Sequence, residues 1–150
     1  MTEHTTPFKL FRPLAIILEA VFAGLAIFGL ALGFNQLTIL GLFCGAGMYM
    51  VGSFYLFKAE RFKPADIALA VFSGVMMAII MIGLLFDLLD WPQGAEMRAI
   101  GQLTLYPALA LTGVIAIFRY LRGEGRTFEM RMSIKLFSRF LVLLLLYLVF

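Results

Sequence analysis

The sequence predicts an all-α, polytopic membrane protein built from tandem parallel helical hairpins, with four spans and a fifth membrane helix at the C-terminus. The mean hydropathy is +1.00 and 63% of the 150 residues are hydrophobic, a composition too apolar for a soluble domain. Four apolar runs also approach the length of about 20 residues with which a helix crosses about 30 Å of hydrocarbon. These runs are residues 13–34, 37–57, 66–86 and 99–118.

The order of charges predicts the orientation of the chain. Eleven of the twelve Lys and Arg residues fall in three clusters, which alternate with a neutral and a mostly acidic connection. Positively charged loops stay cytoplasmic, so the N-terminus is expected inside. The clusters also favour anionic lipid headgroups over nucleic acid as counterions. The expected order is a tail (1–12), hairpin 1 (13–57), a basic loop (58–65), hairpin 2 (66–118), a second basic loop (119–135) and a fifth helix (136–150).

Two short repeats indicate that the hairpins are related. Ala20-Val21-Phe22-Ala23-Gly24 recurs fifty positions later as Ala70-Val71-Phe72-Ser73-Gly74. Two spans separate the copies, so both hairpins are expected to point the same way across the membrane.

The fifth helix has two interpretations. Its apolar run from Phe140 to Phe150 is about 16 Å of helix, which is short of a crossing. Either the helix begins near Ser133, with Lys135 and Arg139 extending toward the interface, or the sequence is the front part of a longer protein. We favour the second interpretation at this point.

Small residues predict where helices approach each other, because helix association in lipid depends on close backbone packing. The motifs Gly29-x-x-x-Gly33 and Gly41-x-x-x-Gly45 flank the same short turn. They are expected to pack within the first hairpin rather than to form a homodimer seam.

Glu19 is the residue with the sharpest functional implication. It is an ionisable side chain well inside the first span, where a carboxylate is expected to be neutral, paired or facing water. Ser53, Ser73 and Thr112 are expected at a similar depth, so a buried polar layer is possible. The alternatives are a conducting site and a structural contact through a hydroxyl or Lys58.

Three carboxylates mark the outer connection of the second hairpin. Asp87 and Asp90 are three residues apart, and Glu96 follows the sequence Trp91-Pro92-Gln93-Gly94-Ala95. Further oxygen ligands for a hard cation are not identifiable. A solvated loop with Trp91 at the membrane interface is therefore the favoured interpretation, and no metal site is predicted.

The stretch from Gly83 to Ala95, followed by Ile100-Gly101, resembles the helical hairpin of GldL-like membrane proteins of Bacteroidetes, which are related to a gliding-motility motor. The resemblance covers residues 70–120 and implies a helical hairpin in a bacterial inner membrane. In GldL such a hairpin belongs to a proton-driven motor. Asp87 and Asp90 stand where that pattern has Lys and His, and Gln93 interrupts its Pro-Gly, so no role of the basic residues carries over.

An enzyme is not expected. His4 is the sole histidine and Cys44 the sole cysteine, and the sequence has no catalytic triad, metal-ligand spacing or phosphate-binding glycine loop. No cofactor is predicted. The sequence favours a structural or interaction subunit of a membrane assembly, bound to another membrane protein or to its own copies. The alternative is a small proton or ion channel or transporter that uses Glu19.

Overall fold

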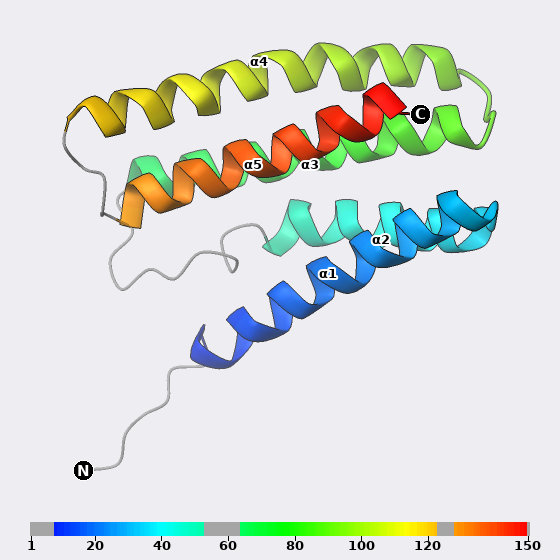
Figure 1. Ribbon diagram of the computed structural model, residues 1–150, viewed down its shortest axis with the longest axis horizontal. Coiled ribbons are helices and arrows are strands. Elements are labelled where there is room, and N and C mark those ends of the chain that lie inside the picture. The colour runs from blue at the N-terminus through cyan, green and yellow to red at the C-terminus, as the bar shows by residue number, and fades with distance from the viewer. Residues whose placement is uncertain (1–7, 53–63, 123–127, 150) are drawn as a thin grey trace.

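The computed structural model describes residues 8–52, 64–122 and 128–149, and all regular elements in these ranges are α-helices. Figure 1 shows the five helices, whose bounds are α1 (Phe8–Leu32), α2 (Asn35–Gly52), α3 (Pro64–Leu88), α4 (Gly94–Leu121) and α5 (Phe128–Val149). Residues Pro13–Leu32 of α1 and the whole of α3 and α4 are long and apolar enough to cross a membrane. The predicted all-helical class is therefore confirmed, with three helices in these ranges that could span a membrane.

The second predicted span is described only in part. α2 is a shorter apolar helix, whereas the prediction extended this span to residue 57. Residues 53–63 lie outside the described part of the chain, and Ser53, Lys58, Arg61 and Lys63 lie among them. A fourth crossing thus remains a prediction.

Two helices end in the same local geometry. At the end of α1, Gly33 has φ +70°, and the Phe34 amide donates to the Gly29 carbonyl at 2.8 Å. At the end of α3, Asp90 has φ 49°, and the Trp91 amide donates to the Phe86 carbonyl at 3.1 Å. Both ends are Schellman closures, which satisfy carbonyls that a helix end would leave unpaired.

α5 begins well before the predicted boundary at residue 136, and this boundary was wrong. Met130, Met132, Ser133 and Leu136 are buried, which gives the predicted loop a helical apolar face against its neighbours. The basic residues Arg131 and Lys135 favoured a loop in the prediction, although their spacing of four residues leaves that face apolar.

α3 is the central helix. It packs against α2, α4 and α5, whereas α1 packs closely against α2 alone among the described elements. Half of the apolar window of α3 is buried, compared with 11% of that of α1. The main core joins α2, α3, α4 and α5 through residues such as Met77, Leu105 and Phe140, and α1 lies at its edge.

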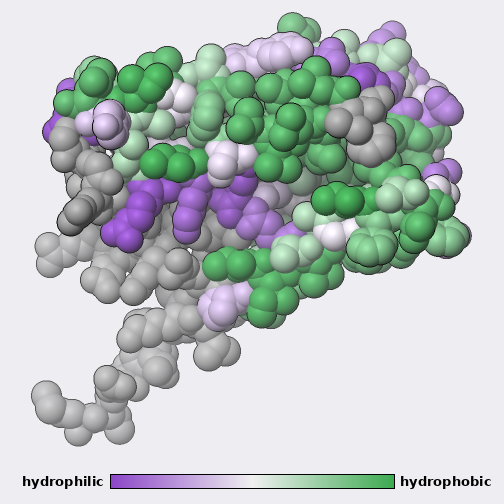
Figure 2. Space-filling view, viewed as in Figure 1, coloured by the Kyte–Doolittle hydropathy of each residue, from purple (hydrophilic) through white to green (hydrophobic). Residues whose placement is uncertain are grey.

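The outer surface is largely apolar. Figure 2 shows hydrophobic residues over most of the visible face, and large side chains such as Leu103, Phe28 and Val114 are more than half exposed. Such a surface is costly in water and is the expected boundary with lipid.

Candidate functional site

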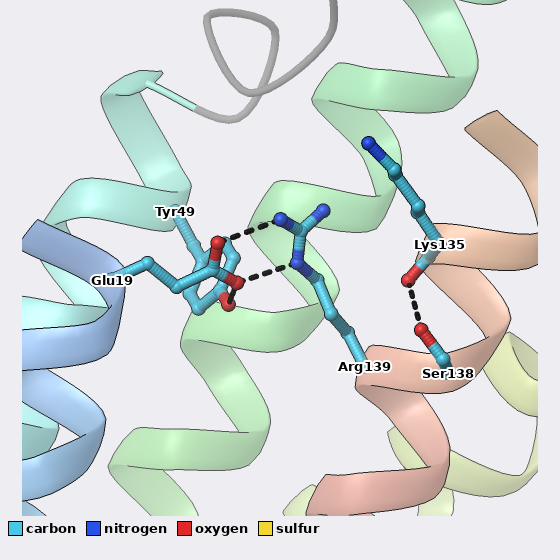
Figure 3. A network of polar contacts seen from close by, with 5 residues as sticks. All are labelled: Glu19, Tyr49, Lys135, Ser138 and Arg139. Carbon is cyan, nitrogen blue, oxygen red and sulfur yellow. Dashed lines mark hydrogen bonds and ion pairs between the residues drawn. The ribbon is translucent and has the colours of Figure 1, made fainter. Parts of the chain in front are cut away.

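Three helices meet at Glu19. Arg139 of α5 donates from Nε to Glu19 Oε1 at 2.5 Å and from Nη2 to Oε2 at 2.7 Å, and the hydroxyl of Tyr49 in α2 also donates to Oε1. Figure 3 shows both oxygens of the carboxylate turned toward the guanidinium. The two-bond geometry is the strong form of an arginine–carboxylate contact.

The contact lies inside the apolar run of α1 and at the start of the apolar run of α5. Glu19 follows Pro13 by six residues, so it lies about 9 Å along α1 from the start of the apolar run. The side chains of Glu19 and Arg139 are about one-fifth exposed. A charge at this depth is stable only with a partner, and this pair supplies one for both residues.

α4 carries two further ion pairs, one near each end. Arg119 Nη2 donates to Asp66 Oδ1 of α3 at 2.9 Å, and its Nη1 donates to Ser133 of α5 at 3.0 Å. At the other end, Arg98 Nη1 donates to Asp87 of α3 at 2.5 Å, and its Nη2 donates to the Tyr147 carbonyl of α5 at 3.3 Å. Each arginine therefore ties α4 to both α3 and α5.

The spacing of these pairs matches the thickness of a membrane. The two aspartates of α3 are 21 positions apart, from 66 to 87, and the two arginines of α4 are also 21 positions apart, from 98 to 119. A helix rises about 31 Å over 21 residues, close to the 30 Å of the hydrocarbon core. The two pairs are thus separated along α3 and α4 by about the thickness of the hydrocarbon core.

Of the predicted polar layer, Ser73 and Thr112 do not join Glu19, and Ser53 lies outside the described residues. Thr112 is buried and donates to the Ala108 carbonyl of its own helix at 2.8 Å. Ser73 is also buried, and its hydroxyl has no hydrogen-bond partner among the described residues. Glu19 bonds instead to Tyr49 and Arg139, and neither hydroxyl bonds to it among the described residues.

The four glycines of the first hairpin have different positions. Gly29 lies against the backbone of Thr38, and Gly41 lies against Ala26 and the Phe22 carbonyl, so each allows α1 and α2 to approach closely. Gly45 instead faces Met81 of α3. Gly33 supplies the positive φ of the turn.

The three outer carboxylates are not gathered into one site. Asp87 is paired with Arg98, whereas Asp90 and Glu96 are exposed. Trp91 packs edge-on against Phe86, with ring centroids 5.0 Å apart. Within the described ranges, no cluster of three or more His, Cys, Asp or Glu side chains could hold a metal ion.

A cavity of about 180 Å³ adjoins the Glu19–Arg139 pair. It lies between α1 and α5, with α2 and Met81 of α3 behind it, and its walls are apolar apart from Glu19, Tyr49 and Arg139. Figure 1 shows α1 diverging from α5 on this side of the molecule. We call this feature the α1–α5 groove.

Sequence reasoning found Glu19 but missed its partners. Arg139 was assigned to the cytoplasmic basic cluster, and Tyr49 was read only as part of an apolar run. Arg119 was assigned to the same basic cluster, and Asp66, the first residue of the predicted span 66–86, was given no role. The equal 21-residue spacing of acids on one helix and arginines on the next was the available signal for the two α3–α4 pairs.

Comparison with protein-family models, curated proteins and solved structures finds no match to this chain. The resemblance of residues 70–120 to GldL-like hairpins therefore stays a prediction.

Proposed function

We propose that this protein is a non-enzymatic structural or interaction subunit of an assembly in a bacterial inner membrane. In this proposal α1 to α4 cross the membrane as two parallel hairpins, with the N-terminus in the cytoplasm. The partner is another membrane protein or further copies of the chain.

The contact between Glu19 and Arg139 is the observation that carries the proposal. A carboxylate that transports ions must exchange its bound cation or proton, whereas Glu19 is held by two bonds from Arg139 and one from Tyr49. The predicted continuation of a polar path, at Ser73 and Thr112, makes no hydrogen bond to Glu19 among the described residues. These features favour a pair that fixes helix positions.

The alternative function is proton or ion conduction through Glu19. The observation in its favour is the cavity, because Glu19 and Arg139 both line it. Ion pairs that border a cavity occur in transport pathways, so the two functions need a direct test.

Proton flux into vesicles separates the two functions. The purified full chain in liposomes, with a potential applied and a pH-sensitive dye enclosed, is expected to give the same signal as empty liposomes. Glu19→Gln and Glu96→Gln should leave that signal unchanged. Flux that Glu19→Gln abolishes and Glu96→Gln preserves would establish conduction and overturn the proposal, because Glu96 is an exposed acid outside the groove.

A further inference from the structure

We propose that the α1–α5 groove binds one anionic phospholipid of the cytoplasmic leaflet, with an acyl chain in the groove and the phosphate at the basic face of α5. This inference concerns a ligand site and does not depend on the proposed assembly.

The shape of the groove fits a hydrocarbon chain. Its lining on α1 runs from Glu19 to Leu30, which is about 16 Å along the helix. The walls between these ends are apolar and include Ala23, Val142 and Leu146. A cavity of about 150 Å³ holds a molecule of the size of benzene, so this elongated space of about 180 Å³ suits a single chain rather than a whole helix.

The basic residues beyond the polar end of the groove lie at the depth where phosphate is found. Ser133 contacts Arg119 at the boundary marked by the Asp66 pair. Arg131 and Lys135 lie two residues on either side of Ser133, about 3 Å above and below it along the helix, and both are exposed. In Figure 3 the side chain of Lys135 extends toward the top of the view, and its ammonium group lies above the guanidinium of Arg139.

Charge complementarity selects an anionic headgroup. The basic residues Arg131, Lys135 and Arg139 recur every four positions, so they share one face of α5 that leads into the groove. Figure 2 shows hydrophilic surface gathered between the left half of α5 and α1, with hydrophobic surface farther right. Two acids at this end, Glu19 and Asp66, are already in ion pairs. The carboxylates of Glu19 and Asp66 therefore do not compete with a phosphate for the cations on this face of α5.

Lipid retention by the purified full chain tests the site. The chain in detergent is titrated with phosphatidylglycerol or phosphatidylcholine, and bound lipid is counted by native mass spectrometry. One phosphatidylglycerol should bind with clear preference. Lys135→Gln should reduce that preference about fivefold, the effect of one cation near an anionic headgroup. Arg122→Gln is the matched control, since Arg122 stacks on Phe118 near the end of α4 and does not line the groove.

Filling the groove tests the position of the acyl chain. Ala23→Phe places a ring in the groove and should reduce binding at least tenfold, whereas Ala20→Phe changes an exposed alanine that does not line it and should have no effect. Equal binding of the two lipids, or equal retention by the two phenylalanine variants, would overturn the proposal. So would a photoreactive residue in place of Ala23 that, in native membranes, cross-links to a protein instead of lipid.

Discussion

Replacing Arg139 with methionine is expected to lower the free energy of unfolding by about 3 kcal/mol, because it strands the carboxylate of Glu19 inside the bundle. Glu19→Gln should cost less. In Glu19→Gln the unpaired residue is Arg139, whose long side chain can extend toward the membrane interface. In Arg139→Met the unpaired residue is Glu19, whose shorter side chain cannot. The double change Glu19→Gln with Arg139→Met should recover most of the loss, since a neutral pair needs no counter-charge.

Unfolding by denaturing detergent in mixed micelles measures these three variants against the parent protein. The expected order of stability is the parent, then the double variant, then Glu19→Gln, then Arg139→Met. Additive losses in the double variant would show that the two charges do not act on each other and would contradict the pairing.

Arg119→Met is expected to have the other large effect, a loss of about 4 kcal/mol. Asp66 is 2% exposed, so removing its partner leaves a fully buried carboxylate and an unpaired contact at Ser133. Both charges also suit their helix ends, since Asp66 is in the first turn of α3 and Arg119 in the last turn of α4.

Arg98→Met is the matched control in the same helix. The Asp87–Arg98 pair is more exposed, and both charges oppose the dipoles of the helix ends that carry them. Its loss should be about 1 kcal/mol, as for pairs near a surface. The same unfolding measurement compares Arg98→Met with Arg119→Met. Equal losses of unfolding free energy in the two variants would contradict the difference in burial between the two ion pairs.

The helical membrane class was predictable from composition and from the length of the apolar runs. The ends of α3 and α4 came close to prediction, since the expected spans 66–86 and 99–118 lie inside Pro64–Leu88 and Gly94–Leu121. These helices are apolar through most of their length. Pro92 lies in the turn between them, and Gly94 is the first residue of α4.

The start of α5 and the partner of Glu19 were not predictable in the same way. Arg131, Lys135 and Arg139 repeat every four residues, a pattern compatible with a cytoplasmic loop or with one face of a helix. Burial of Met132, Leu136 and Phe140 against other helices decides the question, and that packing depends on tertiary structure. The Glu19–Arg139 contact joins residues 120 positions apart, which no local pattern encodes.

The depth of Glu19 was predictable, but the layer expected around it was not formed. Depth along each helix can be counted from sequence, and Ser73 and Thr112 were placed by that count. Whether two residues at the same depth face each other depends on which helices are neighbours. Glu19 bonds to Tyr49 of α2 and Arg139 of α5, whereas Thr112 bonds within α4, so equal depth did not bring these residues together.

The composition of the complex in native membranes tests the proposed role most directly. The chain is released gently from the membranes of its own host, and its mass is measured by native mass spectrometry. The proposal predicts a stoichiometric complex, with a second membrane protein or with further copies of this chain. A single chain that carries lipid alone would contradict a role as an assembly subunit.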